Sequence, residues 1–196
     1  MARQTRKTSK TKTPQTATGR ASNTARRAVR GVVKSVSAHV LPALPHDAVK
    51  LLEKDHRRFE KLMEEGEETT ARARKRRKDV LSTLAAEIVA HERKEEKVLY
   101  PALKRHSEAR DIVLEGYQEH HVADVLVGEL KNMDPADERW GAKFKVLKES
   151  IEHHIGEEEG KMFRTARGIF SREDLQQMAL RMARLKSLAG PAHRAE

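Results

Sequence analysis

The 196-residue chain is long enough for one domain with a buried core and some appendages. It contains no cysteine, which excludes disulfides, thiolate zinc sites, cysteine nucleophiles and cysteine-held iron–sulfur clusters. The net charge of +10 is uneven, because residues 1–46 hold ten Lys or Arg and no acidic residue. No apolar run approaches the ~20 residues needed to cross a bilayer, and the N-terminus lacks the apolar segment of a secretory signal. These features favour a cytoplasmic location.

Residues 1–45 form a basic tail. Its Thr, Ser, Lys and Arg residues bury too little apolar surface to offset chain entropy, so we expect most of it to be disordered. Valines at helical spacing between Arg26 and Val40 predict a weak amphipathic segment. The simplest interpretation is a solvated or loosely docked extension. Binding to nucleic acid or another anionic surface, or a role as an organelle transit peptide, are the alternatives.

Residues 46–188 have the composition of a helical domain, rich in Ala, Leu, Glu, Lys and Arg. Asp47 is a predicted N-cap of the first helix. We expect long helices at 47–70, 78–106, 109–131 and 136–167. The basic run at 72–78 is most simply a solvated loop. Pro101 falls inside the second range, where a proline kinks or ends a helix.

A fifth helix is expected from Ser171 to Leu188, opened by a capping box of Ser171 and Asp174 and packed across the bundle end. Residues 189–196 are a C-terminal tail. Short connections between long helices favour antiparallel neighbours. The sequence therefore predicts an all-α, up-down-up-down four-helix bundle.

Each of the four long segments carries one histidine inside an apolar stripe of period three to four. These histidines are His56, His91, His120 and His154. Three of them are followed one turn later by a carboxylate: Glu95, Asp124 and Glu158. The second stripe continues to Val98 and Ala102. Because the stripes of an antiparallel bundle face one another, we expect these seven side chains to converge.

Several buried carboxylates need a countercharge, and no Lys or Arg occupies the stripes at this level. Four imidazoles with two or three carboxylates exceed a tetrahedral zinc site. They fit two ions of higher coordination number, with Glu95 and Glu158 as candidate bridges. Iron suits this donor set best, with manganese or zinc less favoured. Phe59, Ile88, Val127 and Ile151 are expected to wall an open coordination position. A metal-free bundle with a buried polar network is the least supported alternative.

Two neighbours of the stripes have competing interpretations. His121 follows His120 directly and could replace it as the ligand of the third helix. Tyr117 could hydrogen-bond a bound peroxide, although a core position is the simpler interpretation.

Five phrases of the sequence, in order, resemble the hemerythrin-like HHE cation-binding domain family. They are Asp55-His56-Arg57-Arg58, His91-Glu92-Arg93-Lys94-Glu95-Glu96, Leu99-Tyr100-Pro101-Ala102-Leu103, Glu119-His120-His121 and His153-His154-Ile155-Gly156-Glu157-Glu158-Glu159. The resemblance covers roughly residues 45–188. It implies a non-heme di-iron centre that binds or reacts with dioxygen, peroxide or nitric oxide. An iron-sensing or iron-storage module acting through a partner is the alternative, and whether the chain is an enzyme stays open.

The chain also departs from the oxygen-carrying hemerythrins. Where those proteins have two histidines four residues apart in the third helix, this chain has His120 and Asp124. Where they have an aspartate five residues after the last histidine, this chain has Glu158 at four and Glu159 at five. We therefore expect a more anionic centre, suited to redox chemistry, sensing or iron holding.

Overall fold

The structure is a computed structural model that describes residues 47–188. The basic tail, its predicted weak helix and residues 189–196 lie outside the described residues. The elements are α1 (Ala48–Glu67), α2 (Arg74–Lys94), the π-helical turn η1 (Glu95–Leu99), α3 (Tyr100–Leu103), the 3-10 turn η2 (Ser107–Ala109), α4 (Arg110–Asn132), α5 (Arg139–Glu157), the π-helical turn η3 (Glu158–Met162), α6 (Phe163–Ile169) and α7 (Arg172–Leu188). Among these residues there is no strand.

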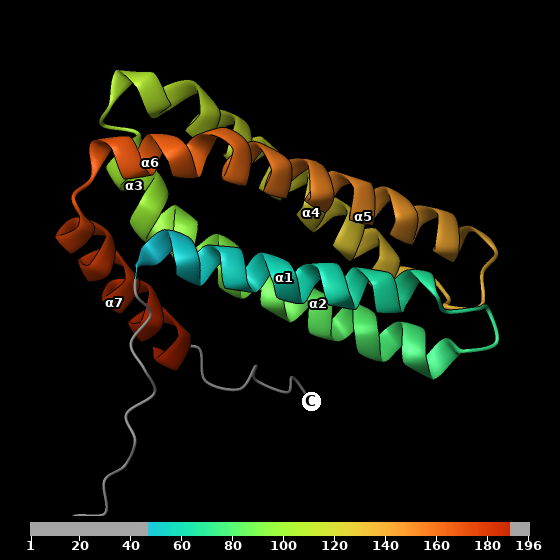
Figure 1. Ribbon diagram of the computed structural model, residues 1–196. Helices are drawn as coiled ribbons and strands as arrows, with labels where there is room; N and C mark the ends of the chain where they lie inside the picture. The colour runs from blue at the N-terminus through green and yellow to red at the C-terminus, as the bar shows by residue number, and fades with distance from the viewer. Residues whose placement is uncertain (1–46, 189–196) are drawn as a thin grey trace, which may run out of the picture. The chain divides into compact units, whose positions relative to one another are not determined.

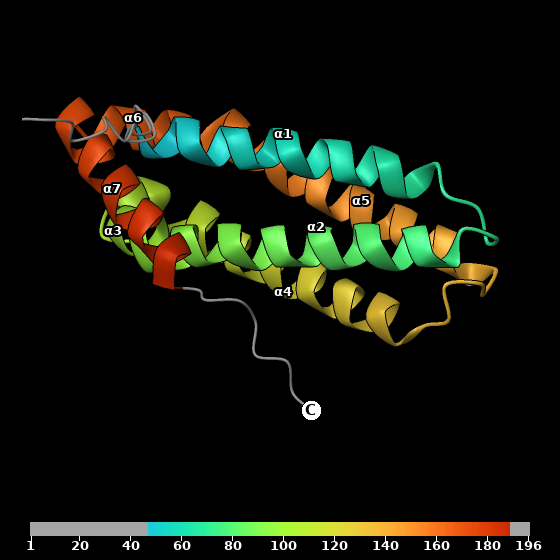
Figure 2. The same ribbon diagram turned by 90° about the horizontal axis from the view of Figure 1, so that it is seen from below.

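Four long helical segments make the bundle. α2, η1 and α3 follow one another without a break, as do α5, η3 and α6, and each series forms one long helix beside α1 and α4 (Figure 1). Successive helices run in opposite directions, and α7 crosses one end of the bundle (Figure 2). The predicted up-down-up-down bundle with a fifth helix is therefore confirmed. No helix of the described residues is long and apolar enough to span a membrane.

The two predicted helix caps are also observed. Asp47 accepts a hydrogen bond from the Lys50 N–H at 2.8 Å and so caps α1. At the start of α7, the Asp174 N–H donates to Ser171 Oγ and the Ser171 N–H donates to Asp174 Oδ2, both at 3.1 Å. This reciprocal pair is the expected capping box.

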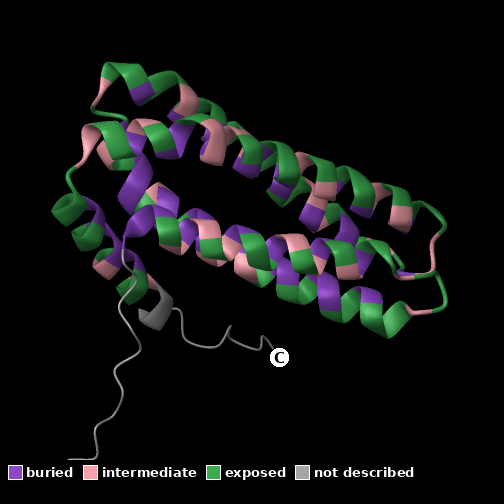
Figure 3. Cartoon of the chain, in the orientation of Figure 1, coloured by how far each residue is buried: buried purple, intermediate pink, exposed green. Residues whose placement is uncertain are grey.

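The core has two hydrophobic parts with a polar layer between them. Figure 3 marks the buried residues of the helices in purple. The first part lies near α7 and includes Leu52, Val98, Val113 and Met162. The second extends toward the other end of the bundle and includes Phe59, Ile88, Ala123 and Ile151. Along every long helix, the striped histidine lies between a residue of the first part and a residue of the second. The polar layer therefore crosses all four helices at one level.

The basic run at 72–78 is not simply a solvated loop, because α2 already begins at Arg74. Arg77 is buried, and its guanidinium carbon lies 4.5 Å from the centre of the Trp140 ring. Its Nη1 donates to the Pro135 carbonyl at 2.7 Å and its Nη2 to the Thr69 carbonyl at 3.2 Å. Arg77 thus joins the segment after α1 to the segment before α5.

Candidate metal centre

Two long helices carry the same local pattern: a histidine, a glutamate four residues later and an aromatic residue five after that. The two sets are His91–Glu95–Tyr100 and His154–Glu158–Phe163. Each glutamate begins a π-helical turn, and the aromatic N–H donates to the glutamate carbonyl five residues earlier. The wider turn brings the aromatic ring to the side of the helix that carries the glutamate. Such turns are frequent at functional sites.

Six of the predicted ligands converge in two overlapping groups. The first group is His56, His91, Glu95 and Glu158, and the second is Glu95, His120 and His154. Within each group the ligand atoms lie within 4.8 Å of one another, and every member is buried. Glu95 belongs to both groups. Glu158 also reaches both halves, since its Oε2 lies 3.2 Å from His56 Nε2 and 3.6 Å from His154 Nε2.

The donor atoms of this cluster are suited to a metal ion. Both carboxylate oxygens of Glu95, Oε2 of Glu158 and Nε2 of His154 are buried without a hydrogen-bond partner. Unsatisfied buried polar atoms are costly and rare in folded proteins, so several at one point indicate a missing ligand. A mixed set of imidazole nitrogens and carboxylate oxygens suits iron, manganese or zinc. The residues present therefore fit such ions.

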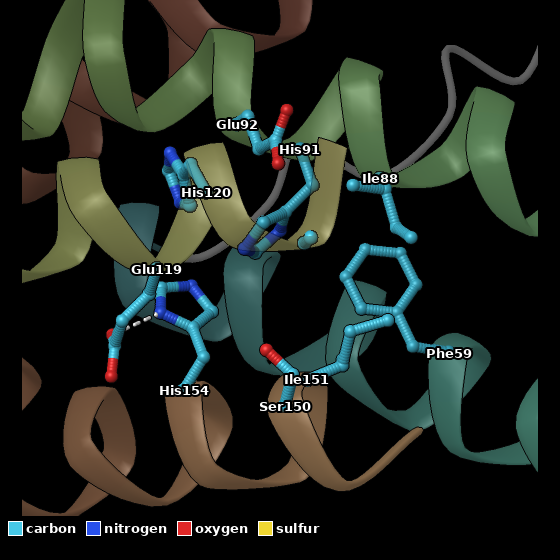
Figure 4. A pocket seen from close by; sticks show the side chains of 10 residues that line it. Phe59, Ile88, His91, Glu92, Glu119, His120, Ser150, Ile151 and His154 are labelled. Carbon is cyan, nitrogen blue, oxygen red and sulfur yellow. Dashed lines mark hydrogen bonds and ion pairs between the residues drawn. The ribbon is translucent and has the colours of Figure 1, made fainter. Parts of the chain in front are cut away.

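Each of the four histidines directs Nε2 into the cluster and Nδ1 toward a second carboxylate. These outer carboxylates pair as Glu159 with His56 at 2.8 Å, Glu96 with His120 at 3.1 Å, Glu119 with His154 at 2.8 Å and Asp55 with His91 at 3.5 Å. Figure 4 shows the contact between Glu119 and His154. Carboxylates in this position orient metal-ligating histidines and make them more basic.

The outer carboxylates were not predicted as functional residues, although the sequence contains a signal for them. Asp55 and Glu119 each directly precede a histidine of the cluster. Glu96 and Glu159 each directly follow one of the buried glutamates. The two halves of the chain thus repeat an acidic residue before the histidine, Asp55 and Glu119, and a Glu-Glu pair at equivalent places.

Charge within the cluster shifts the pKa of its members. Burial alone would lower the pKa of His91, but the carboxylates of Glu95, Asp55 and Glu158 raise it well above its usual value. Against the same cost of burial, mainly Glu95 raises the pKa of His120 to about 9. Burial would raise the pKa of Glu158, whereas the surrounding histidines hold it well below its usual value. In the metal-free cluster the raised pKa values of His91, His120 and His154 therefore favour their protonated forms, and a metal would displace these protons.

Asp124 is the predicted ligand that the structure does not bring into the cluster. It is exposed and outside both groups, because the buried stripe of α4 passes from His120 to Ala123 and Val127. His121 is also exposed, so α4 contributes His120 and not its neighbour.

Tyr100 is a polar residue at the cluster that the stripe pattern did not assign to it. It is fully buried, its hydroxyl donates to Glu158 Oε1 at 3.1 Å, and it lies 3.3 Å from His120 Nε2. Its ring stacks on the His120 ring at a centroid distance of 5.4 Å. Tyr117 lies farther out and meets the Tyr100 ring edge-on. The tyrosine in contact with the cluster is therefore Tyr100.

A cavity of about 20 Å³ adjoins the cluster. Its lining residues are Phe59, Ile88, His91, Glu92, Glu119, His120, Ala123, Ser150, Ile151 and His154 (Figure 4). Three of the four expected wall residues are present, and Ala123 lies where Val127 was expected. Burial raises the pKa of Glu92, which lies in this wall, to about 7. A volume of this size holds a water molecule or a diatomic molecule.

Comparisons with known proteins agree with the geometry. The family model of the hemerythrin HHE cation-binding domain matches residues 47–166. A crystal structure of a hemerythrin HHE cation-binding domain-containing protein from Mycobacterium kansasii is similar, with a TM-score of 0.64 and 20% sequence identity. The match covers 72% of this chain and 86% of the other. A comparison with curated proteins found no match.

Proposed function

This chain belongs to the hemerythrin HHE cation-binding domain family, and from that premise we propose that its buried centre holds two iron ions and binds or reacts with dioxygen, peroxide or nitric oxide. One observation carries the proposal. Two groups of buried donors share Glu95, whose Oε2 lies 3.2 Å from Nε2 of His91 in one group and 3.2 Å from Nε2 of His120 in the other, with no hydrogen bond formed by either Glu95 oxygen. A shared carboxylate with free lone pairs is what two adjacent cations require. Manganese or zinc are the less favoured occupants.

Each residue of the centre has a distinct role in metal binding. His56 and His91 would bind one ion and His120 and His154 the other, while Glu95 and Glu158 supply negative charge to both. The outer carboxylates fix the orientation of the four imidazoles. The Tyr100 hydroxyl donates a hydrogen bond to Glu158 and so orients that carboxylate. Two redox-active ions would supply the electrons with which a small oxidant is reduced.

The size of the cavity supports a very small ligand. About 20 Å³ leaves room for a molecule of a few atoms, such as dioxygen, nitric oxide or peroxide. Apolar side chains of Phe59, Ile88 and Ile151 form part of its wall and keep bulk water from the cluster. Glu92 is a buried acid in the same wall.

The test is anaerobic loading of the metal-free protein with ferrous iron, followed by absorption spectra before and after air or hydrogen peroxide is admitted. We expect about two irons per chain and a new near-ultraviolet absorption after oxidation. Glu158→Gln should lower the iron content, whereas the matched carboxylate variant Asp124→Asn should not. Iron binding without any reaction would favour an iron-sensing or storage module. No bound iron, with helix content intact, would contradict the proposal.

A further inference from the structure

The site is built from two repeats. In each repeat, the residue before the first histidine contacts the second histidine: Asp55 contacts His91, and Glu119 contacts His154. The residue after each buried glutamate contacts the first histidine of the other repeat: Glu159 contacts His56, and Glu96 contacts His120. The first repeat is α1 with α2–α3 and the second is α4 with α5–α6. The two repeats thus place corresponding carboxylates behind corresponding histidines.

Charge breaks this equivalence. In the first repeat, Lys94 is 5% exposed and forms an ion pair with Asp55. At the equivalent place, the second repeat has Glu157, which pairs with Lys161 on its own helix. The Lys94 ammonium therefore neutralises a carboxylate behind one histidine only.

Arg57 adds to the difference. Its Nη2 lies 2.5 Å from Oε1 of Glu159, the carboxylate behind His56. The equivalent residue of α4 is His121, which is exposed. Among residues 47–183, no Lys or Arg lies at ion-pair distance from Glu96 or Glu119. Within that part of the chain, a Lys or Arg thus neutralises each outer carboxylate behind His56 and His91, and neither of those behind His120 and His154.

We propose that the two cation positions differ in affinity, and that the position between His120 and His154 fills first. This inference rests on the proposed metal centre. Two outer carboxylates without a cation place about two more negative charges near one position, and such charges act strongly at the low effective dielectric of a buried site. They also make His120 and His154 better donors. Lys94 and Arg57 are positioning residues: they set the difference in metal affinity between the two positions by neutralising Asp55 and Glu159.

Unequal positions give the site an order of loading. At limiting metal the protein holds a single ion between His120 and His154. When two kinds of cation compete, the ion of higher charge is favoured there and the divalent ion is favoured between His56 and His91. The two repeats then hold a mixed pair.

The experiment titrates the metal-free full chain with cobalt(II), following heat and visible absorption, because cobalt(II) reports its coordination without needing oxygen to be excluded. We expect two binding steps separated by about tenfold in affinity. His154→Gln should remove the tighter step and His56→Gln the weaker one. These two variants assign the steps to the two positions.

Charge variants then test the cause. Lys94→Met should raise the affinity of the weaker step by about tenfold and leave the tighter step unchanged, and Lys94→Arg should retain the wild-type gap. Arg57→Gln should raise the cobalt(II) affinity of the weaker step about two- to threefold, and only at low salt, because Arg57 is 53% exposed and salt screens its charge. The matched control is Arg58→Gln, since Arg58 is 58% exposed and pairs with Glu87, which contacts no histidine of the cluster. It should change neither step.

Two equal steps in the wild-type protein would overturn the inference and leave the metal centre standing. An unchanged gap in Lys94→Met and Arg57→Gln, with helix content intact, would overturn it as well. Because Arg57 is exposed, its variant gives an answer even if Lys94→Met does not fold. No cobalt bound at all would instead contradict the proposed function.

Discussion

Glu119 is a half-buried residue that acts on the neighbouring helix. It lies on α4, but its carboxylate orients His154 of α5, and it also lies 3.3 Å from the exposed His153. Asp124 is on the same helix, also acidic and also near the level of the cluster, yet it contacts no member of either metal group. The two residues show that distance along the chain from a histidine does not decide which carboxylate serves the site.

The pair gives a matched test of the outer carboxylates. Glu119→Gln should weaken metal binding by about 10- to 100-fold, because His154 loses the group that fixes its ring. Asp124→Asn should bind metal as the wild type does. Competition with a metal chelator measures the metal affinity of both variants. Equal loss in the two variants would show that only the net charge of α4 matters.

Tyr100→Phe tests the hydroxyl at the cluster. The variant leaves Oε1 of Glu158 without its hydrogen bond in a buried place, which should lower the free energy of unfolding of the metal-free protein by about 1–3 kcal/mol. Urea denaturation is the measurement. Tyr117→Phe is the control, because Tyr117 is only partly buried and forms no hydrogen bond with Glu158. We expect its free energy of unfolding to stay close to that of the wild type. No loss in Tyr100→Phe would show that Glu158 finds another partner.

The π-helical turns explain which parts of the site could be predicted. His91, His154 and the two glutamates precede or begin these turns, where the ordinary helical period holds, and their predicted stripe positions are buried. His56 and His120 lie on α1 and α4, which contain no such turn, and are buried as well. Beyond the turns the period shifts, so Leu103 is buried where Ala102 was expected, and Tyr100 faces the cluster. Nothing in the apolar pattern announces a π turn in advance. The exposure of Asp124 has a different cause, because both three and four residues after His120 fit a helical stripe and only packing chooses Ala123.

Helix α4 approaches the second long helix closely at Gly116. A Cβ atom at this position would lie 2.6 Å from the Tyr100 hydroxyl oxygen and 3.1 Å from its ring. Gly116→Ala should therefore displace Tyr100 and destabilise the protein by about 1–3 kcal/mol. Gly128→Ala is the matched control, since nothing lies within 4 Å of the added Cβ, and it should stabilise α4 by about 0.5–1 kcal/mol. Thermal unfolding of the two variants should shift in opposite directions. A stabilised Gly116→Ala would contradict the close approach.

Arg77 holds two connecting segments at the end of the bundle away from α7. Arg77→Lys keeps the charge but cannot reproduce the hydrogen bonds to the Pro135 and Thr69 carbonyls or the stacking on Trp140. We therefore expect the free energy of unfolding, measured by urea denaturation, to fall by roughly 2–3 kcal/mol. Arg76→Lys, next to it on an exposed face, should lie within about 0.5 kcal/mol of wild type. If both variants unfold like wild type, the buried guanidinium contributes no net stability.

For the molecule as a whole, the buried charges couple stability to pH. In the metal-free protein, His120 has a folded pKa of about 9 against 6.5 in the unfolded chain. Its contribution to stability is therefore complete below pH 6.5 and is lost as the pH rises through about 9. The pKa of Glu158 is lowered from 4.5, so its contribution is present above pH 4.5 and is lost on acidification below it.

We therefore expect the metal-free protein to be most stable between about pH 4.5 and 6.5. Urea denaturation at a series of pH values measures this. Metal binding at pH 7–8 should release protons, which an indicator dye detects, because the ligating imidazoles must be neutral. A stability that keeps rising from pH 6.5 to 9 would contradict the charge pairing in the cluster.

Helix α7 bears on how the domain should be delimited. The family match ends at Ala166, within α6, whereas the first part of the core is completed by Leu175, Met178, Ala179 and Met182 of α7. A chain cut at the end of the match would keep every residue of the metal cluster but uncover the apolar end of the bundle. The family match at residues 47–166 is therefore shorter than the packed helical domain, which also includes the end of α6 and all of α7.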